Sequence, residues 1–359
     1  MQIEKEFGIE IDEALQHEVN EQEKRNYTMK KFISFFGEHS PIFDELNNRA
    51  AAYAASLGFE YTWSVQKPFD KEQVTRLLSE NDVGLIDVEP YDASIFEHIV
   101  PRCKLLVRFG VGFDKVNLAD ATASGIAVAR TTGANSTGVA EMALTQILAI
   151  RRQLMINRKT VNSGVWVKNV GSELVGATVG IVGFGAIGQL LAQLLQGFKC
   201  TILAYDPNPN LERMAELGVQ SCSLEEVVRV SDAISIHVPY CPATHHMFDA
   251  AVFAQMKKTA VIVCTARGNI IDEDALYDAL KNGVIAGAGL DVYATEPLSA
   301  NSKLIGLDNI ILTPHVSSQT VESLWATYKK AIDIAVDFYA GRPLSKRDLL
   351  NPDYVNHTK

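Results

Sequence analysis

A short apolar segment followed by three closely spaced glycines is the feature that most restricts the fold of this chain. Residues 178 to 182 read TVGIV, which is typical of a buried strand. Gly183, Gly185 and Gly188 follow in G-x-G-x-x-G spacing, and they open the helical segment AIGQLLAQLLQG. A second apolar run, CTILAY, comes next. A strand, a glycine turn, a helix and another strand in this order predict a βαβ unit with parallel strands.

Each glycine of this turn has its own physical role. The first permits the tight turn, the second lets the backbone approach a ligand, and the third lets the helix pack against the strand. The N–H groups near Ala186 and Ile187, at the helix start, then face an anion such as a pyrophosphate. Asp206 ends the next strand, 18 residues after Gly188. A carboxylate there binds ribose hydroxyls and repels a 2′-phosphate, so we expect NAD and not NADP. A glycine turn without any ligand is the alternative.

Strands and helices alternate along most of the chain, and this alternation predicts an α/β fold. Long amphipathic helices are expected over residues 139–161 and 320–341. The expected strands cover residues 30–36, 59–63, 82–88, 103–109, 125–131, 178–182, 200–205, 233–238, 260–264, 286–292 and 309–313.

We interpret this order as two domains. A Rossmann-type doubly wound parallel sheet is expected over residues 131–316, and a second α/β domain is expected to combine 1–130 with 317–359. The polar, acidic residues 1–28 should form an additional helical arm or a partly ordered one.

Composition and charge exclude several classes of protein. The formal net charge is −10 with a pI near 5.3, which argues against nucleic acid or an anionic membrane as a partner. No apolar run approaches the ~18–20 residues that span a bilayer. The five cysteines are scattered without a C-x-x-C pair, and the histidines have no metal-ligand spacing. We therefore expect a cytoplasmic protein with reduced thiols and no bound metal.

Three charged or ionisable residues follow consecutive strand candidates. Arg267 follows the strand at 260–264, Glu296 the one at 286–292, and His315 the one at 309–313. In an open parallel sheet, ligands bind outside the carboxyl ends of the strands. Histidine exchanges a proton near neutral pH, a carboxylate orients it and favours its protonated form, and arginine binds a carboxylate. Each residue alone fits a turn or a cap, but together they predict acid–base chemistry.

The segments around these residues resemble those of a known family. TARGNIIDEDAL, AGAGLDVYATEP and LTPHVSSQT are similar to the arginine, glutamate and histidine motifs of the NAD-dependent D-isomer-specific 2-hydroxyacid dehydrogenases, which include D-3-phosphoglycerate dehydrogenase. The resemblance runs from about residue 80 to 345. It implies that the second domain is a flavodoxin-like α/β substrate domain, that a cleft separates it from the Rossmann domain, and that the protein is a homodimer.

The resemblance also implies an activity and residue roles. The enzyme would interconvert a 2-oxo acid and a D-2-hydroxy acid by hydride transfer, with His315 as acid and base. Glu296 would hold His315, and Arg267 would bind and polarise the substrate. The backbone N–H groups of Val111 and Gly112, in the loop RFGVGFD, would bind the substrate carboxylate. From spacing alone, a plain turn explains that loop equally well. The resemblance further places four residues beside the cofactor: Pro239, Cys264, Thr265 and Asp291.

Several alternatives remain at this point. One is a non-catalytic NAD-binding co-repressor or scaffold on the same fold, and another is an α/β protein with a vestigial site. A formate or phosphite dehydrogenase is a third, although formate enzymes of this family carry glutamine in place of Glu296. Asp87 and Glu89 stand where phosphoglycerate enzymes usually carry arginine and serine. Because carboxylates repel phosphate, 3-phosphoglycerate is not favoured as the substrate.

Overall fold

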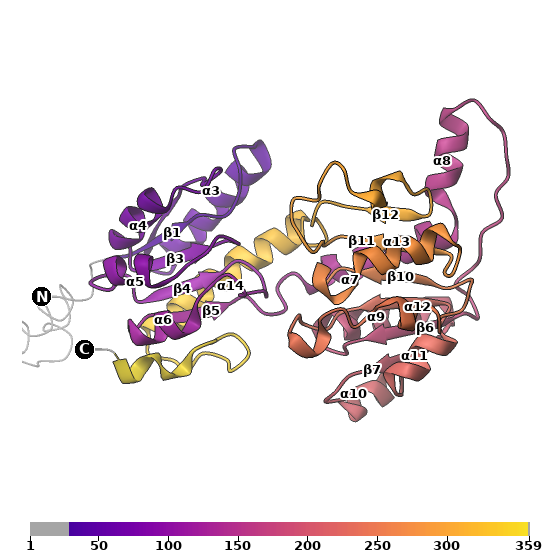
Figure 1. Cartoon of the computed structure of the whole chain (residues 1–359). Helices are drawn as coiled ribbons and strands as arrows, with labels where there is room; N and C mark the ends of the chain where they lie inside the picture. The colour runs from indigo at the N-terminus through magenta and orange to yellow at the C-terminus, as the bar shows by residue number, and fades with distance from the viewer. Residues whose placement is uncertain (1–28, 358–359) are drawn as a thin grey trace, which may run out of the picture. The chain divides into compact units, whose positions relative to one another are not determined.

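The computed structural model describes residues 29–357, so the arm expected over residues 1–28 lies outside the described part (Figure 1). The chain divides into two compact units. One ends at Thr132 and resumes at Trp325, and the other comprises Gly133–Leu324. No helix in the described range is long and apolar enough to cross a membrane.

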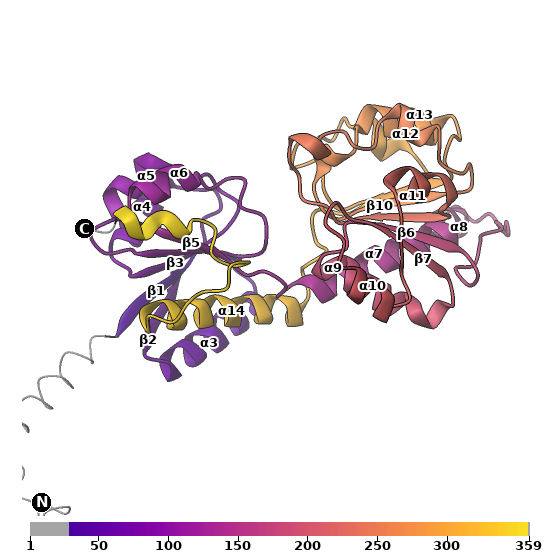
Figure 2. The same cartoon turned by 90° about the horizontal axis from the view of Figure 1, so that it is seen from below.

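The first unit is built on a five-stranded parallel sheet with the order β2-β1-β3-β4-β5, the order of flavodoxin-like sheets. Helices α4, α5 and α6 cover one face, and α3 and α14 cover the other (Figure 2). The elements are β1 (Lys30–Ser34), α3 (Pro41–Ser56), β2 (Phe59–Trp63), α4 (Lys71–Ser79), β3 (Val83–Ile86), α5 (Ala93–Ile99), β4 (Leu105–Arg108), α6 (Leu118–Ala123), β5 (Ala127–Arg130) and α14 (Val321–Tyr339).

The second unit is built on a seven-stranded parallel sheet with the order β12-β11-β10-β9-β6-β7-β8. Helices α7, α9 and α10 lie on one face and α11, α12 and α13 on the other, as Figure 2 shows. The elements are α7 (Ser136–Arg151), α8 (Leu154–Asn162), β6 (Thr178–Val182), α9 (Ala186–Leu195), β7 (Thr201–Tyr205), α10 (Leu211–Glu216), β8 (Gln220–Ser221), α11 (Leu224–Val230), β9 (Ala233–Ile236), α12 (Ala250–Phe253), β10 (Val261–Cys264), α13 (Glu273–Lys281), β11 (Gly287–Leu290) and β12 (Ile310–Leu312).

The predicted fold class is confirmed, because both sheets are parallel and carry helices on both faces. Each face of the seven-stranded sheet packs against its own apolar cluster. Three helices begin with a side-chain N-cap. Asp70, Ser223 and Asp272 each accept a backbone N–H from the first turn of the helix that follows, which is α4, α11 and α13 respectively. The two-residue strand β8 was not expected, because such a short polar segment carries no apolar pattern.

The prediction of one long helix over residues 139–161 is wrong. The segment forms two helices, α7 and α8, because Gln153 takes a left-handed conformation with φ of 51°. Two side chains hold this break: Gln153 Nε2 donates to Val170 O at 2.9 Å, and Arg151 Nη2 donates to Glu173 O at 2.6 Å. The break depends on contacts with a later segment, so the amphipathic pattern of the helix itself does not reveal it.

Candidate active site

His315 and Glu296 form a direct pair at the edge of the seven-stranded sheet. His315 follows β12, and its Nδ1 lies 2.8 Å from Glu296 Oε2. The other carboxylate oxygen of Glu296 accepts the N–H of Tyr293 at 3.0 Å, so both oxygens are oriented. The side chains are 43% and 37% exposed respectively, which leaves the imidazole accessible to a small molecule.

The charge of Glu296 is set by its surroundings. Burial alone would raise the pKa of this carboxyl, but the hydrogen bond and charge of His315 act in the opposite direction. The N–H of Tyr293 and the charge of Arg267 lower it further, and the net pKa of Glu296 is below its ordinary value. Glu296 is therefore a carboxylate over the physiological pH range.

Arg267 belongs to the same charged group. It follows β10 and precedes the short 3-10 helix η3 (Gly268–Ile270). A Cβ on Gly268 would overlap the backbone of Tyr293, so only glycine lets the arginine segment pack against the segment that leads to Glu296. Arg267 Nη1 donates to Ala266 O at 2.7 Å, and its charge acts on Glu296. The structure thus pairs Glu296 with His315 directly, and the charge of Arg267 acts on the same carboxylate.

Asp291 holds the segment that carries His315. Its side chain is fully buried, and Oδ1 accepts the hydroxyl of Thr313 at 2.6 Å and the N–H of Val316 at 2.9 Å. Its Oδ2 accepts the N–H of Ser317 at 2.8 Å. These bonds direct the carboxylate to the residues on either side of His315, and the place beside the cofactor that the resemblance implies for Asp291 stays a prediction. His315 itself has φ of +54°, which the flanking bonds sustain.

Sequence reasoning missed two residues of this arrangement. Gln146 lies on α7, is 1% exposed, and donates from Nε2 to Thr313 Oγ1 at 3.2 Å. Thr313 in turn donates to Asp291, and its carbonyl accepts the Tyr293 hydroxyl at 2.9 Å. A glutamine on the apolar side of a predicted helix was the signal that could have found Gln146, because a buried amide needs a polar partner.

The glycine turn has the geometry that its spacing predicts. Gly183 has φ of +99°, and a Cβ there would lie 2.7 Å from the carbonyl carbon of His237. A Cβ on Gly188 would overlap the carbonyl oxygen of Gly183. Gly185, by contrast, faces open space, since no atom lies within 4 Å of the position that a Cβ would occupy, and it precedes α9, which starts at Ala186. The first and third glycines are thus needed for packing, and the second leaves room for a ligand.

Other predicted cofactor residues lie around this turn. Asp206 follows β7, and its Oδ2 accepts the N–H of Phe184 at 2.8 Å, inside the glycine turn. The hydroxyl of Thr265, after β10, is buried and has no hydrogen-bond partner within the described chain. Cys264 is buried in the core, where burial raises the pKa of its thiol to about 11. The carbonyl of Pro239 accepts the Thr244 hydroxyl at 2.8 Å. The open glycine, the carboxylate and the unpartnered hydroxyl fit a dinucleotide.

The predicted carboxylate loop lies in the first unit, after β4. Gly110 N–H donates to Thr131 Oγ1 at 2.8 Å, and Arg130 Nη1 donates to Val111 O at 3.3 Å. The N–H groups of Val111 and Gly112 donate to no residue between positions 29 and 357. Two adjacent backbone donors without a protein acceptor are suited to a small anion.

Comparison with known proteins gives the family. Residues 144–317 match the model described as D-isomer specific 2-hydroxyacid dehydrogenase, NAD binding domain. The chain is 35% identical over 302 residues to a glyoxylate reductase of Korarchaeum cryptofilum, covering 82% of this chain and 88% of that protein. The chain belongs to the D-isomer specific 2-hydroxyacid dehydrogenases. The predicted family, enzyme class and cofactor, NAD, are thereby confirmed.

Other relatives of this dehydrogenase support the same family assignment. It is 37% identical over 288 residues to D-3-phosphoglycerate dehydrogenase of Mycobacterium bovis, where the match covers 79% of this chain and 54% of the relative, about half its length. Among solved structures it resembles D-2-hydroxyisocaproate dehydrogenase, with a TM-score of 0.79, 26% identity, and coverage of 89% and 99% of the two chains. A NAD complex of formate dehydrogenase from Staphylococcus aureus aligns with a TM-score of 0.74, 29% identity, and coverage of 89% and 98%.

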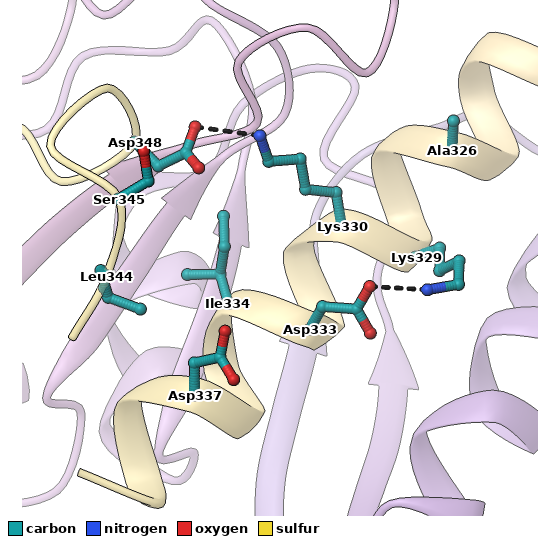
Figure 3. Close-up of a pocket in the computed structure, with 9 residues that line it drawn as sticks. All are labelled: Ala326, Lys329, Lys330, Asp333, Ile334, Asp337, Leu344, Ser345 and Asp348. Carbon is teal, nitrogen blue, oxygen red and sulfur yellow. Dashed lines mark hydrogen bonds and ion pairs between the residues drawn. The ribbon is translucent and has the colours of Figure 1, made fainter. Parts of the chain in front are cut away.

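A hollow of about 440 Å³ in the first unit of the dehydrogenase lies apart from these residues (Figure 3). Its charges form ion pairs along α14: Lys329 with Asp333 at 2.7 Å, and Lys330 with Asp348 at 3.0 Å. None of the predicted site residues lines it. The lining residues are Ala326, Lys329, Lys330, Asp333, Ile334, Asp337, Leu344, Ser345 and Asp348. No group of three potential metal ligands occurs within residues 29–357.

Proposed function

We propose that this dehydrogenase interconverts a 2-oxo acid and the corresponding D-2-hydroxy acid with His315 as the acid and base. The observation that carries the proposal is the 2.8 Å bond between His315 Nδ1 and Glu296 Oε2, with the charge of Arg267 acting on the same carboxylate. NAD, when bound, supplies or accepts the hydride. The remaining chemistry, the transfer of a proton and the stabilisation of charge, belongs to the side chains.

The hydrogen bond to Glu296 fixes the role of each ring nitrogen. With Nδ1 bound to the carboxylate, Nε2 of His315 is the nitrogen that exchanges a proton with the substrate oxygen. In reduction it delivers a proton to the oxygen at C2, and in oxidation it removes the hydroxyl proton. Arg267 binds the substrate and stabilises the negative charge that develops on this oxygen. The N–H groups of Val111 and Gly112 bind the substrate carboxylate.

The decisive experiment is a turnover assay of the purified chain with NADH and a panel of 2-oxo acids, starting with glyoxylate because relatives are named glyoxylate reductase. NADH consumption that depends on the 2-oxo acid, with D-hydroxy acid as product, is the expected result. Binding of NADH without turnover of any member would instead favour the non-catalytic co-repressor or scaffold. The same assay with NADPH tests whether Asp206 excludes the 2′-phosphate.

We also propose that the enzyme is a homodimer, formed through α8 and the segment after it. This part of the second unit exposes a run of large apolar side chains, which is unusual for a solvated surface. Trp166 and Val170 are 83% and 87% exposed, and Leu154, Met155, Val161, Val165, Val167 and Val175 are exposed as well. Analytical ultracentrifugation should give a dimer, and a double variant Trp166→Glu/Val170→Glu should shift it to monomer. A monomeric unsubstituted chain would overturn this proposal.

The five cysteines are free thiols, a state typical of reducing compartments, and this supports a cytoplasmic location.

A further inference from the structure

A group of charged side chains lies beside the carboxylate loop of the first unit. Asp87 and Glu89 follow β3, and Arg108 is the last residue of β4. The two strands are parallel neighbours, with Ile86 paired to Arg108, so their carboxyl ends open on one edge of the sheet. The loop that begins at Gly110 leaves the sheet at the same edge.

Contacts connect this charged group to the loop. Arg108 Nη1 lies 3.7 Å from Asp87 Oδ1, and it is 3.3 Å from the position that a Cβ on Gly110 would occupy. The side chains of Arg108 and Asp87 are only 11% and 15% exposed. The guanidinium of Arg108 therefore lies close to both Asp87 and the start of the loop. The N–H groups of Val111 and Gly112 are proposed to hold the substrate carboxylate. The other end of a short substrate bound there could then contact Arg108 and Asp87.

One buried polar atom of the segment after β3 has no partner within the described chain. It is the hydroxyl of Tyr91, whose side chain is 1% exposed. Burial raises the pKa of this hydroxyl, and the charges of Glu89 and Asp87 act in the same direction. Burial, together with the charge of Asp87, raises the pKa of Glu89. The acceptors that remain open to a ligand at this edge are the carboxylates of Asp87 and Glu89, which are only partly buried.

We propose that Asp87, Glu89 and Arg108 form the subsite for the distal end of the 2-oxo acid, and that this subsite selects a hydroxyl group there over an alkyl group or a phosphate. This inference rests on the proposed function and specifies its substrate class.

The balance of charge decides between the possible distal groups. Arg108 and Lys67 both act on Glu89 with attractive charge, so two cations offset the two carboxylates of Asp87 and Glu89. A neutral group rich in acceptors gives no net attraction for an ammonium group. A phosphate is disfavoured because its oxygens would face the carboxylate oxygens of Asp87 and Glu89, and acceptors cannot bond to one another. An alkyl group offers these carboxylates no hydrogen bond, whereas a hydroxyl donates one.

The test compares the specificity constant, kcat/KM with NADH, for hydroxypyruvate, pyruvate and 3-phosphohydroxypyruvate. The unsubstituted enzyme should favour hydroxypyruvate over both others by about tenfold or more. Glu89→Gln should reduce the ratio of hydroxypyruvate to pyruvate by about tenfold, because it replaces a charged acceptor with a neutral one. Glu89→Lys should raise the ratio of 3-phosphohydroxypyruvate to pyruvate by about tenfold, a gain that a merely destabilised variant cannot produce.

Glu97→Gln is the matched control, since Glu97 is an exposed residue on α5 of the same unit. The values of kcat/KM of this variant for the three substrates should equal those of the unsubstituted enzyme. Equal loss on all three substrates in Glu89→Gln, or a preference of the unsubstituted enzyme for pyruvate or the phosphorylated acid, would overturn the inference and leave the proposed function intact. Inactivity of the unsubstituted enzyme on these three acids and on glyoxylate would overturn the proposed function, and the inference with it.

Discussion

His315 Nδ1 lies 2.8 Å from Glu296 Oε2, and this bond leaves Nε2 of the imidazole with no partner within residues 29–357. An imidazole bound to a carboxylate at one nitrogen and open at the other can transfer a proton at the open side. Three of the following predictions concern this pair and the residues that hold it, and the other concerns the glycine turn.

His315→Gln removes the group that exchanges the proton. We expect kcat to fall by about 10²–10⁴-fold, the range for loss of a positioned acid–base group. The dissociation constant of NADH, measured by fluorescence titration, should stay within a factor of about two or three, because His315 follows β12 and does not belong to the glycine turn. Unchanged kcat in this variant would remove His315 from the mechanism.

The Glu296–His315 pair makes a pH-dependent contribution to stability. The pKa of Glu296 is lower in the folded chain than its ordinary value of about 4.3. Such a carboxyl stabilises the fold above the unfolded pKa, and this contribution disappears as the pH falls through the folded pKa. The difference in urea midpoint between the unsubstituted enzyme and Glu296→Gln should therefore shrink between pH 5 and pH 3. Glu141→Gln, at an exposed residue of α7, is the control and should show no such trend.

The first two glycines of the turn should respond differently to alanine. Gly183→Ala puts a Cβ at positive φ within 2.7 Å of His237, so we expect a loss of unfolding free energy of at least ~1–3 kcal/mol. Gly185→Ala meets no protein atom within 4 Å and should unfold like the unsubstituted enzyme, but its NADH dissociation constant should rise by about tenfold because the methyl group enters the ligand's space. Undiminished NADH affinity in Gly185→Ala would contradict this position for the pyrophosphate.

Asp291→Asn tests the anchoring of the His315 segment. The amide of this variant has a single oxygen acceptor, whereas Asp291 accepts with both carboxylate oxygens. The N–H of Val316 or of Ser317 therefore loses its acceptor, which should lower the unfolding free energy by ~1.5–3 kcal/mol. We expect lower unfolding free energy and lower kcat, since Val316 and Ser317 no longer hold His315. Thr313→Val removes one of the three bonds to Asp291 and also the bond from Gln146, so it too should lower the unfolding free energy. Its effect on kcat should be the smaller one, because the N–H groups of Val316 and Ser317 keep their acceptors. If Thr313→Val lowered kcat more than Asp291→Asn, Asp291 would not be the anchor.

The sequence alone was enough to predict the fold class and the glycine turn, whereas the roles of the site residues stay predictions. The strand before Gly183, the glycine spacing and Asp206 are encoded within about 30 residues, and a βαβ unit follows from them because each element is recognised by its own periodicity. The polar residues after β10, β11 and β12 could be predicted to meet because parallel strands end at the same edge of a sheet.

Tertiary structure alone decided the features that depend on residues distant in sequence. The break at Gln153 is held by bonds to Val170 and Glu173, so no local pattern marks it. Gln146 reaches Thr313 across 167 positions, and Asp291 holds the His315 segment from another strand. A sequence pattern records which face of an element is apolar. The partner of a buried polar atom is chosen by long-range packing, where hydrogen-bond geometry and exclusion of water make the choice.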